Sequence, residues 1–550
     1  MRINTCRIVT RFGAILLVAL GTSTARAEEP ASTAPKGEVQ HHTFDQSKIF
    51  PGTTRDYWIY IPKQYDPAKP ACLYVGQDGI QYKAPEVFDD LINKGEVPVL
   101  IGVFVMHGRV KAPSDQALDR FNRSYEYDGL GDAYVRFINE EILPEVEKKT
   151  AADGRKLRIS TKGDDRSIGG SSSGAICAFT AAWERPDSFR RVFSAIGTYV
   201  GLRGGNVYPT LIRKYEPKPL RVFLEDGSSD LNIYGGDWWM ANQEMERALT
   251  FAGYEVEHNW GKGGHSAEHA TQIFPDAMRW LWKGWPNEIK AGPGSAQLQE
   301  IVVAGEGWTA AAEGLISADR LTADASGAIY FGPGQAATEI PSPFEPAAAP
   351  TIRRLESNGR ASKVVENAAV LGAALDGRIT NHKGQYFDAT GGAWLMTSAD
   401  ADVAPLEPAV SSIGGLALSP DQSLLYVADA DSKWVYSFQV QEDGAPKYGQ
   451  KYYHLHVPDD ADDAGAGAMC VDRDGRLYVA TRMGIQVCDQ AGRVNAIIPT
   501  PGGPATGLCF GGPERNVLYV ACGDAIYKRK LKTQGVDPTA APIKPKTPRL

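Results

Sequence analysis

The sequence predicts a protein of two lobes, an α/β/α sandwich followed by an all-β propeller. In residues 40–287, strand-like and helix-like segments alternate, which favours a mostly parallel sheet covered by helices on both faces. Residues 299–531 instead repeat a two-strand unit at about 40–50 residues, the spacing of propeller blades. The chain of 550 residues is long enough for several domains.

The first lobe is justified segment by segment. Short apolar runs at 57–61 and 71–75 predict strands. The continuous apolar run at 97–105 suits a strand covered on both faces. Residues 132–149 place apolar side chains at helical spacing. A further strand is predicted at 221–224, and helices at 238–252 and 270–285.

The second lobe is built from repeated units, each a short strand, a turn with Asp, Gly or Pro, and a second strand rich in Tyr and Val. Four copies lie at 319–331, 415–429, 468–480 and 507–521, with a degenerate copy at 376–387. Such repeats do not bury their faces alone, so a closed ring is the economical arrangement. Turn formation accounts for their Asp residues. Residues 288–298 are interpreted as a linker and 532–550 as a flexible tail.

Residues 1–27 predict a signal peptide. Arginines precede an apolar run at 12–21, and Ala25, Arg26 and Ala27 form a small-residue cleavage site. The run is about half the ~20 residues that a membrane span needs. We therefore expect an exported protein, periplasmic or secreted, with no membrane attachment after cleavage.

Composition restricts the partners. Hydrophobic residues make up 43% and charged residues 23% of the chain, as in an ordinary globular protein. The net charge of -8 argues against a nucleic-acid partner held by clustered Lys and Arg. Loss of the four arginines of residues 1–27 would take it to -12. Nothing in the sequence indicates the oligomeric state.

Six cysteines follow the signal peptide. They lie within apolar runs, as small buried hydrophobes do, although export would permit disulfides. Pairing cannot be read from sequence, so a bridge stays open among Cys470, Cys488, Cys509 and Cys522.

The strongest chemical signal is a candidate nucleophile. Residues 170–174 read Gly-Ser-Ser-Ser-Gly, which fits G-x-S-x-G with Ser172 at the centre. A serine hydroxyl is a poor nucleophile unless a strained strand-to-helix turn lifts it clear of the sheet beside a base. A plain Gly/Ser-rich loop is the alternative. The helix-like run that follows favours the nucleophile.

The general base should come last in chain order, after the acid. His265 lies in a glycine-rich loop just before the last predicted helix of the first lobe, where its imidazole could reach Ser172. His269 is the second candidate and could instead belong to the exposed first turn of that helix.

The acid should follow a strand. Asp230 ends the loop after residues 221–224 and is placed to orient the imidazole. Asp226 fits a turn former, and Asp237 fits the N-cap of the next helix. We favour Asp230.

Ester hydrolysis also requires donors for the oxyanion. The backbone N–H of Ser173 is expected to supply one donor. A backbone N–H at Gln77 or Asp78, in the turn after an early strand, is expected to supply the other.

These motifs, in this order, carry a resemblance. With residues 123–128 (Arg-Ser-Tyr-Glu-Tyr-Asp) and 185–189 (Arg-Pro-Asp-Ser-Phe), they resemble the enterochelin esterase-like branch of the α/β-hydrolases over residues 40–287. The resemblance implies a triad of Ser172, Asp230 and His265. It also implies esters of siderophores, or acyl and aromatic esters on polysaccharides, as substrates.

The second lobe resembles the gluconolactonase/regucalcin family over residues 299–531, through 414–421, 469–480, 484–487 and 509–513. That resemblance implies six blades, an axial divalent cation such as calcium, and opening of sugar lactones. However, Gly414 and Gly467 stand where the family has Asn and Asp, and glycine offers no side-chain oxygen to a cation. Only Asp319 and Asp376 remain as metal candidates.

The favoured hypothesis is an exported serine hydrolase that needs no cofactor and cleaves a small-molecule or carbohydrate ester, with a degenerate propeller as a binding or accessory domain. Two alternatives stay open. One is a metal-dependent sugar lactonase acting from the propeller. The other is a non-catalytic scaffold of two domains.

Overall fold

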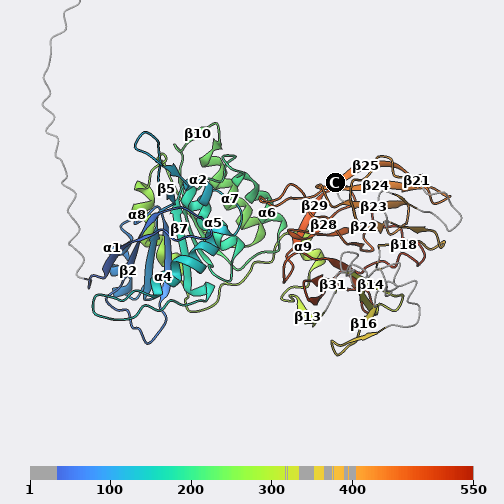
Figure 1. The fold of residues 1–550 in the computed structure, drawn as a ribbon, viewed down its shortest axis with the longest axis horizontal. Helices are drawn as coiled ribbons and strands as arrows, with labels where there is room; N and C mark the ends of the chain where they lie inside the picture. The colour runs from blue at the N-terminus through green and yellow to red at the C-terminus, as the bar shows by residue number, and fades with distance from the viewer. Residues whose placement is uncertain are drawn as a thin grey trace, which may run out of the picture.

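The computed structural model describes residues 34–315, 318, 320–332, 352–363, 375, 377–388, 394–395 and 404–548. The predicted signal peptide, Asp319 and Asp376 lie outside the described residues. The chain folds into two lobes, an α/β lobe and a lobe of small antiparallel sheets (Figure 1).

An eight-stranded sheet organises the first lobe, in the order β1-β2-β4-β3-β7-β8-β9-β12. The first three strands of that order pair antiparallel and all later pairs are parallel. This is the mostly parallel sheet that the sequence predicts. The strands are β1 (Glu38–Phe44), β2 (Arg55–Ile61), β3 (Cys72–Gln77), β4 (Leu100–Val105), β7 (Arg166–Ser171), β8 (Arg191–Ala195), β9 (Arg221–Gly227) and β12 (Glu255–Gly261).

Helices cover both faces of this sheet, because alternate strand residues point to opposite sides. On one face, Leu73 and Val75 join a core with α5, α6, α7 and the segment 133–147. On the other, Tyr74 joins a core with α1 and α8. The helices are α1 (Ala84–Asn93), α2 (Arg123–Tyr127), α3 (Ala133–Arg136), α4 (Leu143–Glu147), α5 (Ser173–Glu184), α6 (Tyr208–Lys214), α7 (Trp238–Ala252) and α8 (Glu268–Trp282).

Shorter elements complete this lobe. The predicted helix at 132–149 runs through α3 and α4 with a π-helical segment, Phe137–Ile142, between them. Two hairpins, β5 (Arg109–Val110) with β6 (Arg120–Phe121) and β10 (Asn232–Ile233) with β11 (Gly236–Asp237), extend beyond the main sheet. Short 3₁₀ turns lie at Gly163–Asp165 and Gly205–Val207.

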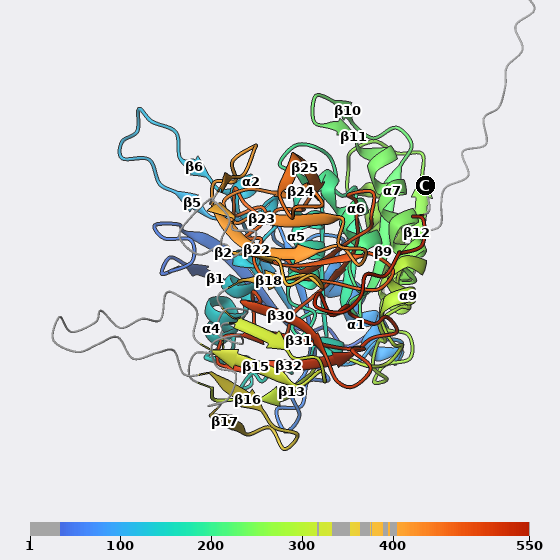
Figure 2. The same cartoon turned by 90° about the vertical axis from the view of Figure 1, so that its right-hand side faces the viewer.

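The second lobe is a propeller-like arrangement of antiparallel sheets (Figure 2). One sheet contains β13 (Thr309–Ala312), β30 (Gly507–Gly511), β31 (Val517–Cys522) and β32 (Ala525–Lys530). The first strand of the lobe therefore completes a sheet whose other strands come from the end of the chain. The other four-stranded sheets are β14 (Arg320–Ala323), β15 (Ile329–Gly332), β16 (Arg353–Leu355), β17 (Ala361–Lys363); β22 (Ile413–Leu418), β23 (Leu424–Asp429), β24 (Trp434–Val440), β25 (Pro446–His454); and β26 (Met469–Val471), β27 (Leu477–Thr481), β28 (Gly484–Cys488), β29 (Val494–Ile498).

The expectation of six blades is wrong for the part of the chain that the structure describes, which forms four four-stranded sheets. Between β17 and β22 the described chain forms two two-stranded ladders with strands of two residues: β18 (Ile379–Thr380) with β19 (Tyr386–Phe387), and β20 (Trp394–Leu395) with β21 (Ala404–Pro405). The physical reason is that the degenerate copy at 376–387 lacks the Val- and Tyr-rich runs that form the longer strands β23 and β31.

Asp residues form the turns of the blades, as interpreted from the sequence. Oδ1 of Asp489 accepts hydrogen bonds from the backbone N–H groups of Ala491 and Arg493 at 3.0 and 3.1 Å. Asp324 accepts in the same way from Ser326 and Ala328, at 2.8 and 3.1 Å. These carboxylates satisfy turn amides, which explains why they recur at this position of the repeat.

The two lobes share a buried interface. Tyr215, just after α6, forms a β-bridge with Ile497 of β29. Its neighbour Glu216 forms a two-pronged ion pair with Arg529 of β32, each N–O distance being 2.7 Å. The Arg529 side chain is 2% exposed, so this ion pair is part of the packed boundary.

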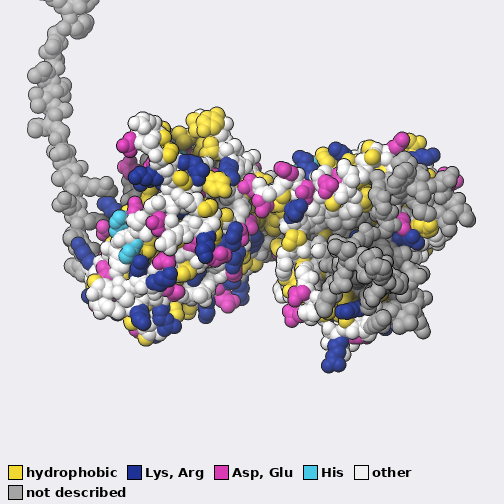
Figure 3. Space-filling model, viewed as in Figure 1, with side chains coloured by type: hydrophobic (Ala, Val, Ile, Leu, Met, Phe, Trp, Pro, Cys, Tyr) yellow, Lys and Arg dark blue, Asp and Glu magenta, His cyan; other side chains and the backbone are white. Residues whose placement is uncertain are grey.

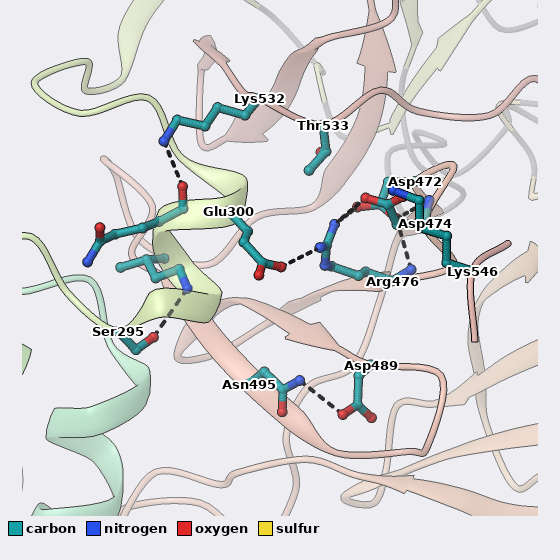
Figure 4. Close-up of polar contacts among 12 residues, drawn as sticks. Ser295, Glu300, Asp472, Asp474, Arg476, Asp489, Asn495, Lys532, Thr533 and Lys546 are labelled. Carbon is teal, nitrogen blue, oxygen red and sulfur yellow. Dashed lines mark hydrogen bonds and ion pairs between the residues drawn. The ribbon is translucent and has the colours of Figure 1, made fainter. Parts of the chain in front are cut away.

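A short helix, α9 (Ala296–Ile301), connects the lobes and lies against the second one. Leu298 and Ile301 pack with Ile498 in a core of the propeller. Glu300 pairs with Arg476 at 3.0 Å, and Arg476 also contacts Asp472 and Asp474, as Figure 4 shows. Helical structure thus begins within the predicted linker.

The six cysteines after the signal peptide are unpaired, and five of them are buried. The disulfide left open by the sequence is therefore absent among Cys470, Cys488, Cys509 and Cys522. Among the described residues, no helix has both the length and the apolar character needed to cross a membrane.

Candidate active site

Ser172 occupies a strained turn between β7 and α5. Its φ of 59° and ψ of -121° lie in a backbone region that non-glycine residues rarely adopt. Glycine is required at positions 170 and 174 because other parts of the chain lie too close for a side chain. A Cβ on Gly170 would lie 2.7 Å from the carbonyl group of Gly174, and a Cβ on Gly174 would lie 3.1 Å from Cβ of Gln77. The turn has the strained strand-to-helix geometry that G-x-S-x-G predicts.

The structure brings Ser172, His265 and Asp230 together although 93 residues separate the first two. Nε2 of His265 lies 2.9 Å from Oγ of Ser172. Nδ1 of His265 lies 2.7 Å from Oδ1 of Asp230. The Asp230 side chain is fully buried and the imidazole is 22% exposed. This is the hydrogen-bond order in which a serine can lose its proton to an imidazole held by a carboxylate.

Two facing loops set the position of His265. Parallel pairing of β9 with β12 ends at Gly227 opposite Gly261. Beyond it, the Ser229 N–H donates to the carbonyl of Gly263 at 3.1 Å. A Cβ on Gly227 would lie 2.2 Å from that same carbonyl oxygen, so only glycine allows this approach. The acid and the base are therefore brought together by main-chain contacts.

The electrostatics favour an ionised Asp230. Burial raises the pKa of its carboxyl, but hydrogen bonds with His265, Asp226 and the Leu231 N–H outweigh burial and hold the pKa below its ordinary value. An ionised carboxylate fixes the tautomer in which Nδ1 of His265 carries a proton and Nε2 faces Ser172.

The other candidates for acid and base have different partners. Nδ1 of His269 lies 2.7 Å from Glu225. Asp226 accepts from the Gly227 N–H at 2.6 Å and from Asn242 at 2.8 Å. Asp237 caps α7 by accepting from the Met240 N–H at 3.0 Å, as the cap interpretation expected.

Two segments flank the serine where an oxyanion would form. Ser173 is the first residue of α5, so its N–H has no partner within the helix. Across from it, Asp78 and Gly79 have φ values of 58° and 76° and turn the chain after β3. The Asp78 N–H donates to the Tyr127 hydroxyl at 3.3 Å, while the buried Gln77 side chain packs under Gly174.

Sequence reasoning missed two residues beside the serine. Oγ1 of Thr198 lies 3.3 Å from Oγ of Ser172. Nε1 of Trp238 lies 3.4 Å from the same threonine oxygen, and its ring meets that of His265 edge-on at 5.9 Å. Neither residue belongs to a motif, since both reach the site only through folding.

Two more polar groups border the site. Arg123 pairs with Asp78 through two nitrogens at 2.7–3.1 Å and is 35% exposed. Asp128 accepts from the Ser173 hydroxyl at 3.2 Å. Arg123 and Asp128 lie in the 123–128 motif, so this signal was present in the sequence without a role attached.

Exposed apolar side chains lie on short elements of the same lobe: on β6, on α2 and in the turn between β10 and β11. Tyr234, at the tip of the β10–β11 hairpin, is 91% exposed, and Phe121 and Tyr125 are more than 60% exposed. Figure 3 shows hydrophobic side chains gathered over the end of the lobe that carries β10.

Among the described residues, the propeller offers no set of side chains for the divalent cation that its resemblance implies. A Cβ on Gly414 would lie 2.0 Å from the carbonyl oxygen of Ala466, so this backbone has no room for a ligating side chain there. Among the described residues, no three His, Cys, Asp or Glu side chains converge as a metal site. Asp319 and Asp376 are outside those residues.

Comparison with known proteins agrees with this division. Residues 48–277 match the family model described as "Putative esterase". Residues 353–523 match the model described as SMP-30/Gluconolactonase/LRE-like region. The first lobe thus matches an esterase family, and the second lobe matches a gluconolactonase-like family.

Individual relatives match parts of the chain. A gluconolactonase of Zymomonas mobilis subsp. mobilis is 27% identical over 150 residues, 25% of this chain and 40% of that protein. Regucalcin of Sus scrofa is 28% identical over 132 residues, 22% of this chain and 42% of that protein. The chain thus spans about two fifths of the length of these curated relatives.

Solved structures of esterases are similar to part of this chain. A ferulic acid esterase matches with a TM-score of 0.36 and 18% identity, over 45% of this chain and 99% of its own. Enterobactin esterase from Shigella flexneri matches with a TM-score of 0.36 and 19% identity, over 46% of this chain and 60% of its own.

Proposed function

We propose that this protein is an exported serine hydrolase that cleaves carboxylic esters. The observation that carries the proposal is the continuous hydrogen-bonded series from Ser172 through His265 to Asp230 at a strained elbow. The match of residues 48–277 to an esterase family supports it. Export rests on the sequence features of residues 1–27 alone.

The reaction would proceed in two halves. Nε2 of His265 takes the hydroxyl proton as Oγ of Ser172 attacks the ester carbonyl, and a tetrahedral oxyanion forms. The N–H of Ser173 and an N–H of the turn at Gln77 and Asp78 would stabilise that charge. Collapse expels the alcohol, which takes the proton from His265. Water, deprotonated by the same imidazole, then attacks the acyl-enzyme and releases the acid.

The substrate class follows from the resemblance and the surroundings of the site. We infer a siderophore-type ester, or an acyl or aromatic ester on a polysaccharide. The exposed rings of Phe121, Tyr125 and Tyr234 could contact an aromatic or sugar ring, since aromatic faces favour such partners. The propeller would serve as a binding or accessory domain, and the esterase would need no cofactor.

Substitution of the nucleophile tests the proposal. Ser172→Ala should abolish hydrolysis of short p-nitrophenyl esters without changing the thermal unfolding midpoint by more than a few degrees. Ser167→Ala is the matched control, because Ser167 lies in β7 and its hydroxyl donates to the Leu73 carbonyl at 3.1 Å, so activity should persist. Retained turnover in Ser172→Ala would reject the mechanism.

The same assay separates the alternatives. A chelator should leave ester hydrolysis intact. Lactone hydrolysis that a chelator removes and Ser172→Ala retains would instead indicate a metal-dependent lactonase in the propeller. Absence of both ester hydrolysis and labelling by a fluorophosphonate probe would favour the scaffold.

A further inference from the structure

A second carboxyl group lies directly behind the acid of the proposed triad. Asp226, at the end of β9, is fully buried. Its carboxyl is within hydrogen-bond distance of the carboxyl of Asp230. Ionised carboxylates accept hydrogen bonds and do not donate them, so this contact requires a proton on one of the two.

The partners of Asp230 leave one oxygen in need of a donor. Oδ1 of Asp230 accepts from Nδ1 of His265 at 2.7 Å and from the Leu231 N–H at 2.6 Å. Oδ2 is buried, and no other donor of the described residues satisfies it. A buried carboxylate oxygen without a partner is costly, and the Asp226 carboxyl is in place to supply the missing hydrogen.

The surroundings place the proton on Asp226. Burial and the charge of Asp230 raise the pKa of Asp226 well above its ordinary range, while the imidazole of His265 keeps Asp230 ionised. Asn242 does not require an ionised Asp226. Its Nδ2 has three acceptors within 3.0 Å, on Asp226, Gly197 and Trp238, for two hydrogens.

We propose that Asp226 remains protonated and donates a hydrogen bond to Oδ2 of Asp230, as a positioning residue for the triad. The inference rests on the proposed ester hydrolysis. The bond would fix the plane of the Asp230 carboxylate, so that Oδ1 stays directed at Nδ1 of His265. It would also keep a second negative charge away from Asp230.

The proposal has a consequence at alkaline pH. Loss of the Asp226 proton would remove the donor and set two carboxylates against each other, so activity should fall. The charged or titratable groups around Asp226 are Asp230 and Glu225, with His265 and His269 as their respective partners. From α7 the facing side chain is the uncharged Asn242.

Two substitutions of Asp226 distinguish a hydrogen-bond donor from a residue that only fills space in the core. Asp226→Ala should lower kcat for p-nitrophenyl acetate at least about 10-fold with little change in KM, because a hydrogen bond to a charged group is lost. Asp226→Asn should stay within about threefold of the parent, because its amide still donates to Asp230. Unlike the parent, Asp226→Asn should show no alkaline fall in background-corrected kcat.

The neighbouring carboxyl is the matched control. Glu225 points to the opposite face of β9, where it contacts His269, so Glu225→Gln should retain the alkaline fall. An Asp226→Asn variant that loses more than 10-fold, or that keeps the alkaline fall, would overturn the proposal. Asp226→Asn decides the question even when Asp226→Ala does not fold. Full activity of Asp226→Ala beside an inactive Ser172→Ala would reject this inference alone, whereas an active Ser172→Ala would reject the proposed function itself.

Discussion

At the scale of single residues, the backbone of Ser172 is strained, and neighbouring contacts hold it in that conformation. The positive φ of Ser172 costs about 1–3 kcal/mol and persists because its surroundings fix it. The Ser172 N–H donates to the carbonyl of Ala195 at 2.9 Å, and α5 follows at once. The strain directs Oγ at His265, so the same backbone distortion that costs stability would serve the reaction.

Asp230→Asn tests the role of the acid. If the proposed mechanism holds, the amide would no longer stabilise a positive imidazole and would favour the wrong tautomer, so kcat should fall by about 10³–10⁴, as in serine hydrolases with a Ser-His-Asp triad. Steady-state hydrolysis of p-nitrophenyl esters measures the loss. Asp237→Asn makes the same change seven residues on, and asparagine also caps helices. A loss of equal size in Asp237→Asn would contradict a special role for Asp230.

At the scale of elements, glycines set how closely loops approach. Gly227 and Gly263 face each other across the loops that carry Asp230 and His265, yet only Gly227 is enclosed. A Cβ on Gly263 would have nothing within 4 Å. The loops therefore tolerate a side chain on one side of the contact and not on the other.

Gly227→Ala should displace the His265 loop. The added methyl would meet the Gly263 carbonyl, and overpacking of this kind costs about 1–3 kcal/mol. We expect kcat/KM to fall at least 10-fold, with far-ultraviolet circular dichroism unchanged. Gly263→Ala should keep activity near that of the parent protein. Equal activity of the two variants would show that the loop contact does not position the base.

The hydrogen bonds of the blade turns predict that the propeller loses stability at acidic pH. Burial raises the pKa of Asp489, but hydrogen bonds from Arg493, Asn495 and turn amides outweigh it, and the pKa is lowered. Because the pKa of Asp489 is lower in the folded state, its carboxylate stabilises the fold at pH values above the unfolded-state pKa near 3.8. This stabilisation is lost as the pH falls through the folded-state pKa. The thermal unfolding midpoint should therefore fall below about pH 4.

Asp489→Ala should remove this contribution together with the turn hydrogen bonds, about 1–2 kcal/mol at neutral pH. Asp489→Asn keeps an acceptor for the turn amides and should lose less. The difference between the parent and either variant should shrink at pH 3, as urea titration can measure. A difference that grows with acidity would contradict the sign.

At the scale of the whole molecule, the lobes are joined by specific contacts as well as by the chain. The Tyr215 strand bridge and the Glu216–Arg529 ion pair connect the segment after α6 with β29 and β32. A guanidinium exposed by only 2% depends on its partner, because a buried unpaired charge is costly.

Arg529→Met should loosen this boundary while keeping most of the apolar stem. Loss of charge-assisted hydrogen bonds should lower the free energy of unfolding by about 1–3 kcal/mol and separate the calorimetric transitions of the lobes. Arg185→Met is the control, since its partner Asp187 is 64% exposed and such pairs contribute about 0–1 kcal/mol. A single unshifted transition in Arg529→Met would contradict a coupling role.

Residue order alone was enough to predict the two-lobed organisation, four of the eight main strands of the first lobe (β2, β3, β4 and β9), the bounds of α7 and the three residues that meet at the elbow. Periodicity, turn chemistry and motif order are local properties, and the chain displays them directly. The sequence did not determine the blade count, because weak repeats do not reveal how many strands will pair.

The network of side chains around Ser172, His265 and Asp230 became apparent from the folded structure and not from the sequence. Thr198, Trp238, Asp226 and Asn242 belong to no motif, and their roles arise when β8, β9 and α7 meet beside Ser172. The folded structure also shows that the backbone at Gly414 leaves no room for a metal-ligating side chain. The physical reason is that hydrogen bonding and steric exclusion depend on distances between segments far apart in the chain, which residue order does not specify.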